Sequence, residues 1–344
     1  MASPNRAHIA LVCEDAGPAA AWAPVVLELQ RRGFSLSVWA TGRAKETFGR
    51  RNIPTLTFCE SWLDDRPALV MTGTAGWGDR IDARAVRAAR HASIPTLSYV
   101  DFWWRYPERF THHEPLDSLP DVIAVVDERM RDGVTQAISG VDRIVVTGSP
   151  LLDEARSALR EPVSDGAPVL FLSQPLEALY GTSSADAHAI GYTERDVLPI
   201  VARATASHRL ELRVRAHPRE DAGALRSFLG SLAGTPKLSE GRTIHEDIAE
   251  SRAVVGMTTM GLAEAALMGR PTLSIQLSAA TLSLPTFGTA LGALAQDERA
   301  VTLWLDALVE GSLLQSDSLE TSAGAVERLA DAVERLLSER AAPR

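Results

Sequence analysis

Cysteine is scarce in this sequence, which has only Cys13 and Cys59 among 344 residues. Two cysteines cannot build a disulfide framework, and neither belongs to a CxxC pair. Both lie in apolar runs typical of strands, so we expect two small, buried side chains. His112 and His113 are adjacent, but no cysteine or spaced set of acids accompanies them, and we expect no bound metal.

Long apolar runs and an excess of basic charge are also missing. No stretch reaches the roughly 20 apolar residues that cross a bilayer, and residues 1–8 lack the apolar region of a signal peptide. The net charge of −9 disfavours long-range attraction to nucleic acid or anionic lipid. We therefore expect a cytoplasmic protein that holds any phosphate through local dipoles and a few placed cations. Peripheral membrane contact and the oligomeric state stay open.

The length of the chain indicates more than one domain. Its hydrophobic content of 45% and charged content of 23% are those of a globular protein, and 344 residues exceed what one core usually supports. A loop rich in Pro, Gly, Ser and Asp lies at 161–167. We predict an N-terminal domain at 1–160, a C-terminal domain at 161–322, and a helix at 323–344 that could return to the first domain.

Apolar strands and helices alternate along both halves. The run HIALVC at 8–13 is typical of a strand buried on both faces. A small-residue turn at 14–18, a helix from about 20 to 32 and a strand at 35–40 follow, which together indicate a parallel pair with a crossover helix. Further strands are predicted at 68–72, 95–101, 122–126, 143–147, 168–173, 211–216, 253–256 and 272–276, and helices at 82–92, 194–207, 222–233, 245–251 and 261–268. The pattern predicts an α/β fold with two Rossmann-like, doubly wound domains.

The segment VVGMTTMGLAEAALMGRPTLSI at 254–275 is the strongest candidate for a ligand site. A tight loop of Thr258, Thr259 and Met260 follows a strand, and a helix starts at Gly261. Unpaired N–H groups and the helix dipole attract anions there, and glycine lets a ligand approach the backbone. Glu264, one turn inside the helix, can accept from a ribose hydroxyl. The alternative is that a threonine only caps the helix, with Glu264 completing a capping box.

Polar residues leave three other strands at their carboxyl ends. Ligands of open α/β sheets bind outside those ends, so each is a candidate for nucleotide contact. The residues concerned are Arg215 and His217, Ser173 and Gln174, and Gly148 and Ser149. A structural histidine and an interdomain turn are the competing interpretations.

The segment DFWWRYPERF at 101–110 combines aromatic, basic and acidic side chains after a strand. Aromatic rings with arginine suit a sugar ring, an aromatic substrate, or a carboxylate or phosphate. The candidates for acceptor or substrate contact are Asp101, Trp103, Trp104, Arg105, Tyr106 and Arg109. Alternatively, the loop packs its aromatics over the edge of the sheet.

Taken in order, these segments resemble the GT-B superfamily, which includes nucleotide-sugar glycosyltransferases and UDP-N-acetylglucosamine 2-epimerases. The resemblance extends over nearly the whole chain and rests on short motifs: the opening strand and helix, TGSPLLD, RAHPRE and MTTMGLAEAALMGRPTLSI. It implies two domains facing a cleft, with the nucleotide in the second and the acceptor in the first. It also implies diphosphate contacts at Thr258, Thr259 and Gly261, and a ribose contact at Glu264.

The same resemblance gives the remaining assignments. Nucleotide or hinge contacts fall on Gly148, Ser149 and Ser173, and a catalytic role on His217. Catalytic groups lie near the exit of the first strand, where Asp15 could act as general base. That exit lacks the Thr-Arg-Pro opening of the epimerases, which disfavours strict epimerase activity.

We therefore expect a metal-independent glycosyltransferase without a tightly bound cofactor, which uses a UDP- or CMP-type sugar to build a surface polysaccharide or to modify a metabolite. Hydrolysis or epimerisation of the nucleotide sugar, or simple binding of it, are the alternatives.

Overall fold

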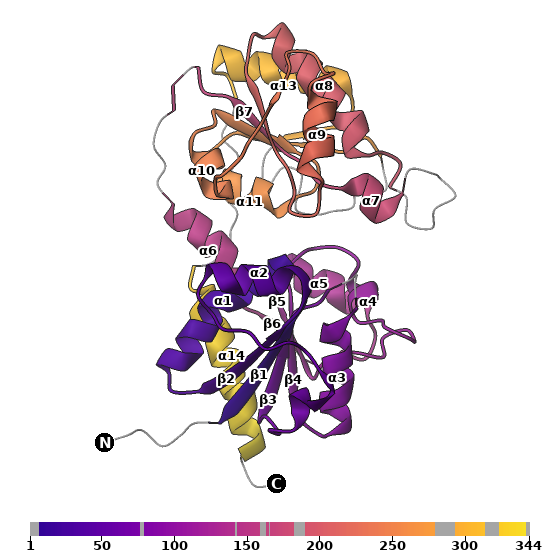
Figure 1. Ribbon diagram of the computed structural model, residues 1–344, viewed down its shortest axis with the longest axis vertical. Helices are drawn as coiled ribbons and strands as arrows, with labels where there is room; N and C mark the ends of the chain where they lie inside the picture. The colour runs from indigo at the N-terminus through magenta and orange to yellow at the C-terminus, as the bar shows by residue number, and fades with distance from the viewer. Residues whose placement is uncertain are drawn as a thin grey trace. The chain divides into compact units, whose positions relative to one another are not determined.

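The computed structural model describes residues 7–75, 79–141, 143–158, 163–164, 166–181, 190–278, 293–313 and 323–341. The chain divides into two compact units, one formed by residues 1–153 with 321–344 and the other by residues 154–320 (Figure 1). Within the described residues, each unit contains one six-stranded sheet in which the neighbouring strands are parallel. This confirms the predicted α/β fold with two Rossmann-like, doubly wound units.

The first sheet has the strand order β2-β1-β3-β4-β5-β6. Its strands are β1 (His8–Cys13), β2 (Ser35–Ala40), β3 (Leu69–Thr72), β4 (Thr96–Val100), β5 (Val122–Val125) and β6 (Ile144–Val146). The helices of this unit are α1 (Ala16–Arg31), α2 (Gly42–Arg50), the 3₁₀ helix η1 (Glu60–Leu63), α3 (Ile81–His91), α4 (Tyr106–Arg109), α5 (Glu128–Ala137) and α14 (Ala325–Ala341), and α6 (Pro150–Ser157) spans the boundary between the units.

Strand β1 is covered on both faces, which explains its continuous apolar sequence. Ala10 and Val12 belong to a core cluster with Ile81 and Ala85 of α3. Leu11, between them, is fully buried and points to the opposite face, because successive side chains of a strand alternate.

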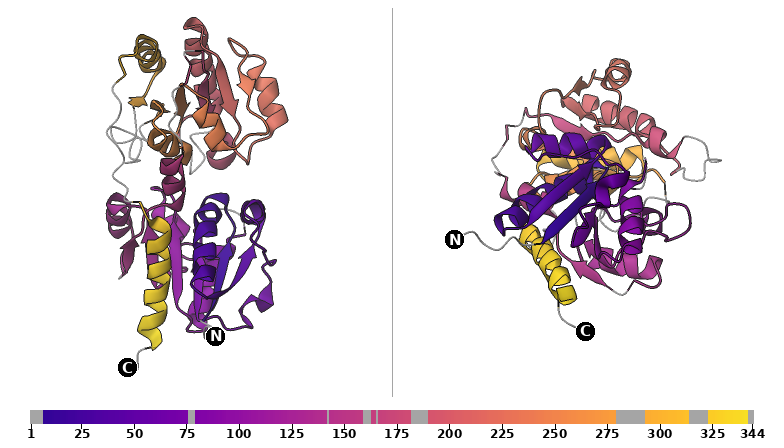
Figure 2. Two further views of the ribbon diagram at one scale, coloured as in Figure 1. Left: turned by 90° about the vertical axis from the view of Figure 1, so that its left-hand side faces the viewer. Right: turned by 60° about the horizontal axis from the view of Figure 1, so that its bottom comes forward.

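The last helix in the sequence lies along the first unit (Figure 2). Helix α14 packs against α1, and Arg32 at the end of α1 forms an ion pair of 2.6 Å with Asp331. On the same helix, Arg328 donates to the carbonyl oxygen of Thr147 at 2.9 Å. These contacts make residues 323–341 part of the first unit.

The second sheet has the strand order β12-β11-β10-β7-β8-β9. Its strands are β7 (Val169–Leu172), β8 (Leu212–Arg215), β9 (Lys237–Leu238), β10 (Ala253–Gly256), β11 (Thr272–Ile275) and β12 (Ala293–Ala295). The helices are α7 (Leu176–Tyr180), α8 (Glu194–Ser207), α9 (Ala222–Leu229), α10 (Ile244–Ala249), α11 (Met260–Leu267) and α13 (Glu298–Glu310).

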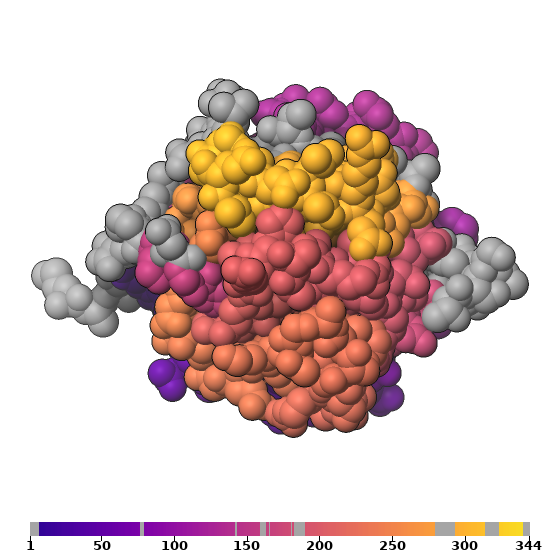
Figure 3. Space-filling model, turned by 90° about the horizontal axis from the view of Figure 1, so that it is seen from above, coloured from indigo at the N-terminus to yellow at the C-terminus, as the bar shows by residue number. Residues whose placement is uncertain are grey.

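One outer face of the second unit is formed by α8 and α13, which lie side by side (Figure 3). Arg203 and His208 near the end of α8 contact Glu298 at 2.9 Å and Asp306 at 2.7 Å on α13. Among the described residues, no helix is both long and apolar enough to cross a bilayer. The expected cytoplasmic location stays a prediction.

Two local expectations are wrong. Cys59 is exposed, whereas Cys13 is buried as expected, because the chain around Cys59 precedes a 3₁₀ turn and forms no strand. Helix α1 begins at Ala16, where the sequence suggested a turn as far as Pro18. A proline in the first helical turn removes no intrahelical hydrogen bond, so it does not delay the helix.

Candidate functional site

The second sheet has a topological switch point between β7 and β10. From β7 the chain continues to β8 and β9 on one side, and from β10 to β11 and β12 on the other. The connections diverge there, and ligands of open α/β sheets bind outside the carboxyl ends of the strands at such a point. Ser173 and Gln174 leave β7 at this point, and Thr258 follows β10.

Gln174 links the two strand exits across the switch point. Its Oε1 accepts from the backbone N–H of Thr258 at 2.8 Å, and its amide lies 3.3 Å from the Thr258 hydroxyl. Ser173 is 3% exposed and donates to Oε1 of Glu220 at 2.7 Å. The polar side chains at this edge are therefore positioned by one another.

Helix α11 begins at the switch point. Thr259 is its N-cap and accepts from the backbone N–H of Gly261 at 3.4 Å, and the first helical residue is Met260. Such a start presents N–H groups to an anion. The capping role considered for a threonine is thus real, and the anion contact at this helix start stays a prediction.

The structure gives a packing reason for glycine at position 261. Gly261 is buried, and a Cβ there would lie 2.6 Å from Cδ1 of Leu172 and 2.8 Å from Cδ1 of Ile244. The glycine permits close packing of α11 against β7 and α10, and the expected approach of a ligand to the backbone stays a prediction.

Glu264 does not complete a capping box. Its carboxylate Oε2 accepts from Nε2 of His245 on α10 at 2.8 Å, and its side chain is 9% exposed. The carboxylate lies one turn inside α11, and its ribose contact stays a prediction.

His217 follows β8 in a tight loop stabilised by Glu220. Oε2 of Glu220 accepts from the backbone N–H of His217 at 2.6 Å, and Nδ1 of the imidazole lies 3.1 Å from the backbone N–H of Arg219. Because that N–H can only donate, Nδ1 is the acceptor, and a neutral His217 carries its proton on Nε2. Burial raises the pKa of Glu220, against the hydrogen bonds from His217 and Ser173.

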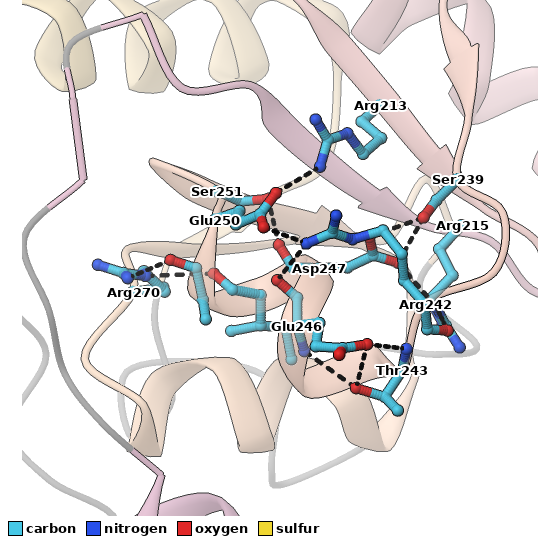
Figure 4. Close-up of polar contacts among 12 residues, drawn as sticks. Arg213, Arg215, Ser239, Arg242, Thr243, Glu246, Asp247, Glu250, Ser251 and Arg270 are labelled. Carbon is cyan, nitrogen blue, oxygen red and sulfur yellow. Dashed lines mark hydrogen bonds and ion pairs between the residues drawn. The ribbon is translucent and has the colours of Figure 1, made fainter.

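Arg215 at the end of β8 belongs to a network around a fully buried carboxylate, Asp247 of α10 (Figure 4). Arg215 donates to Oδ2 of Asp247 at 2.7 Å and to the carbonyl oxygen of Arg242 at 2.9 Å. Arg242 and Ser239 contact the same carboxylate at 3.1 and 2.7 Å. Both hydrogen bonds of Arg215 use Nη1, so Arg215 has a supporting role in this network, and its expected phosphate contact stays a prediction.

Replacing Arg215 by methionine should destabilise the second unit by about 2–3 kcal/mol, because it removes one partner of a buried charge. We expect the melting temperature to fall by about 4–12 °C in calorimetry. Arg213→Met is the matched control on the same strand, since Arg213 lies 3.5 Å from the exposed Glu250 and such surface pairs contribute about 0–1 kcal/mol. Equal melting temperatures for the two variants would contradict the role given to Asp247.

The first sheet has its own switch point, between β1 and β3. Asp15 follows β1 at the N-cap position of α1, but its side chain makes no capping hydrogen bond. Beside it, Glu14 accepts from the backbone N–H groups of Asp79 and Ile81 at 2.8 and 3.1 Å, which fixes the start of α3. Asp82 accepts from the N–H of Ala75 at 2.9 Å.

Asp101 and Arg109 come together at the carboxyl end of β4. Arg109 donates to Oδ1 of Asp101 and to the hydroxyl of Thr74, each at 2.9 Å. A Cβ on Gly17 would lie 2.3 Å from Oδ2 of Asp101, so any other residue at position 17 would displace this carboxylate from its present position. The acid, the arginine and the start of α1 thus form one polar cluster.

The aromatic residues of 101–110 divide into buried and accessible ones. Trp103 is 2% exposed and donates to Asp127 at 2.8 Å, and Tyr106 is 9% exposed against Gly133. Both rings are packed inside the protein, in agreement with the alternative interpretation of this loop. They are therefore not accessible to a ligand. Trp104 is half-buried, with the guanidinium of Arg105 4.8 Å from the centre of its ring.

Gly148 and Ser149 belong to the first unit, between β6 and α6. The carbonyl oxygen of Gly148 accepts from the hydroxyl of Tyr99 at 3.1 Å, and Ser149 is 2% exposed. The structure therefore describes them as buried residues at the exit of the sheet, and their nucleotide contact stays a prediction.

Sequence reasoning did not single out Glu220, Asp247 or His245. Each acts through a partner that only the fold supplies, such as Glu264 for His245. The one available signal was the acidic segment HEDIAE at 245–250, which reads equally well as a solvated helix. Among the described residues, no three His, Cys, Asp or Glu side chains are grouped as metal ligands.

No family model and no curated protein sequence matches the chain. Several solved structures do match it in fold. A UDP-GlcNAc 2-epimerase of Methanocaldococcus jannaschii, solved with UDP-GlcNAc and UDP, is 12% identical with a TM-score of 0.67, and the match covers 96% of this chain and 99% of that one. MnaA of S. aureus, solved with UDP, is 14% identical with a TM-score of 0.68 and 97% of each chain covered.

A glycosyltransferase also matches. CalG4, the calicheamicin glycosyltransferase, is 14% identical with a TM-score of 0.58, over 99% of this chain and 100% of that one. Similarity at these identities concerns the fold. The chain has the GT-B fold, as the motifs implied.

Proposed function

We propose that this protein is an enzyme that binds a nucleotide sugar at the switch point of its second unit and transfers the sugar to an acceptor bound by its first unit. The observation that carries the proposal is the convergence of the α11 start, the Gln174–Thr258 link and His217 at the carboxyl ends of β7, β8 and β10. Proteins of the same fold have been solved with UDP and UDP-GlcNAc.

The parts of this site match the parts of a nucleotide diphosphate. The N–H groups at the start of α11, with Thr258 and Thr259, would bind the phosphates, and Glu264 would bind the ribose. Nε2–H of His217 would stabilise the charge that develops on the leaving diphosphate, which is electrostatic stabilisation of the transition state without a metal.

In the first unit, the acceptor would lie at the Asp101–Arg109 cluster, with Trp104 and Arg105 beside it. Asp15, at the exit of β1 on the same edge of the sheet, would take the proton of the acceptor hydroxyl.

A thermal-shift panel of UDP, CDP, GDP and CMP tests the nucleotide site. At about 100 times its dissociation constant, a nucleotide specific for the folded protein should stabilise it by about 2.7 kcal/mol. Thr258→Val should reduce the shift, whereas Thr302→Val on α13 should not. If none of the four nucleotides raises the melting temperature, the proposed function is wrong.

Epimerisation or hydrolysis is the second candidate, favoured by TM-scores of 0.67 and 0.68 with the M. jannaschii epimerase and MnaA against 0.58 with CalG4. Incubation of UDP-GlcNAc with the protein in the absence of an acceptor separates the two. Release of UDP, or a change of configuration in the sugar, would favour this candidate, and turnover only with an added acceptor would favour transfer.

A further inference from the structure

Helix α10 is held in the second unit through its middle and through its carboxyl end. Asp247 on its inner side is fully buried and is held by Arg215, as described above. At its carboxyl end, Arg270 donates to the carbonyl oxygens of Ile248 and Ala249 at 3.2 and 2.5 Å (Figure 4). A helix of six residues has little stability of its own, so these contacts determine where its other side chains lie.

His245, in the first turn of α10, uses that position to hold Glu264. Nε2 of His245 donates to Oε2 of Glu264 at 2.8 Å, which occupies one of the two carboxylate oxygens. The other oxygen, Oε1, has no hydrogen-bond partner among the described residues. It is not fully enclosed by protein atoms either. It is the oxygen that a ligand can reach.

The position of Glu264 on α11 directs this oxygen toward the phosphate site. Met260, the first residue of the helix, and Glu264 are four residues apart and so share one face. Because Cα–Cβ bonds tilt toward the N-terminus of a helix, the carboxylate leans toward the helix start. A ribose hydroxyl of a nucleotide whose phosphates bind that start would come within its reach.

We infer that His245 is a positioning residue that fixes the Glu264 carboxylate so that its Oε1 accepts from a ribose hydroxyl, which makes the site selective for ribonucleotides over their deoxy counterparts. The inference rests on the proposed nucleotide site. A histidine donor orients the carboxylate without adding a group that competes for the hydroxyl.

The test compares dissociation constants, by titration calorimetry, for UDP, CDP, GDP and ADP and for the 2′-deoxy and 3′-deoxy forms of the tightest binder. Loss of a hydrogen bond to a charged group weakens binding by about 10- to 100-fold, so at least one deoxy form should bind that much more weakly to the wild type. His245→Phe removes the donor and keeps the ring volume. It should bring the ribo and deoxy forms to within about threefold of one another and leave the affinity for the deoxy form unchanged.

Two further variants separate positioning from packing. His245→Gln keeps a donor near the position of Nε2 and should retain selectivity. Glu246→Gln, next to it on α10, keeps the capping box with Thr243 and should behave as the wild type. If His245→Phe retains the preference, or weakens ribo and deoxy forms equally, the inference is overturned while the proposed function stands. A wild type that binds neither CMP nor any of the four ribonucleoside diphosphates would overturn the proposed function itself.

Discussion

Asp82→Asn should stabilise the protein, and the gain should be larger at pH 8 than at pH 5 by about 2–3 kcal/mol. Asp82 is 2% exposed, and burial raises its pKa to about 7, with Glu14 and Asp101 adding to the effect against the hydrogen bond from Ala75. One carboxyl oxygen, Oδ1, is enclosed without a hydrogen-bond partner. The group therefore favours its neutral form, which asparagine imitates.

The direction of this pH dependence follows from the pKa of Asp82 in the unfolded and in the folded state. In the unfolded chain Asp82 loses its proton near pH 3.9, whereas in the folded protein it keeps the proton to about pH 7. The folded state binds more protons than the unfolded state between these values. The contribution of Asp82 to the free energy of unfolding is therefore highest below about pH 4 and falls as the pH rises to about 7. Asparagine does not titrate, so the stability of the variant does not contain this pH-dependent loss.

Thermal unfolding of wild type and variant at pH 5 and pH 8 measures the difference, which should amount to about 4–12 °C in melting temperature. Asp117→Asn is the control of opposite sign. Although burial opposes it, hydrogen bonds from the backbone of His112, His113 and Glu114 lower the pKa of Asp117. Its contribution is lost only below about pH 4, so Asp117→Asn should destabilise equally at both pH values. An Asp82→Asn gain that does not depend on pH would contradict the shifted pKa.

The order of strands and helices could be predicted because buried parallel strands leave a visible pattern. IALVC and AVVG are apolar throughout, since both faces of each strand are covered. Helix α8 has the predicted ends, 194 and 207, because Thr193 and Asp196 form a capping box and local residues determine such a start. The candidate nucleotide site was found for the same reason, since strand exits and helix starts are local features.

The functions of individual polar residues could not be predicted in that way. Arg215 reads as a cation at a strand exit, but its partner Asp247 lies 32 residues further on. Gln174 and Thr258 are 84 residues apart. Gly261 illustrates the same limit, because a glycine at a helix start has the same local sequence whether a ligand or the side chains of Leu172 and Ile244 occupy the space beside it.

His217→Asn should lower the rate of nucleoside diphosphate release far more than His217→Gln. The backbone N–H of Arg219 fixes Nδ1 as an acceptor, so the donor of the neutral ring is Nε2–H, which the proposed function assigns to the diphosphate. The amide nitrogen of glutamine lies near the position of Nε2, whereas that of asparagine lies near Nδ1. Losing one preorganised donor to a developing negative charge costs about 100- to 1,000-fold in kcat, and we expect a loss of this size for asparagine and about tenfold or less for glutamine.

The comparison distinguishes a donor from a general base. A base at His217 would have to accept a proton at a nitrogen, and an amide cannot replace it, so glutamine and asparagine would then be equally inactive. Steady-state release of the diphosphate from the nucleotide sugar selected in the thermal-shift panel measures kcat for both variants. Calorimetric binding of the diphosphate product shows whether the loss lies in the reaction or in the ground state. Equal losses would contradict the donor role, and a variant with asparagine more active than glutamine would place the reacting group on the Nδ1 side.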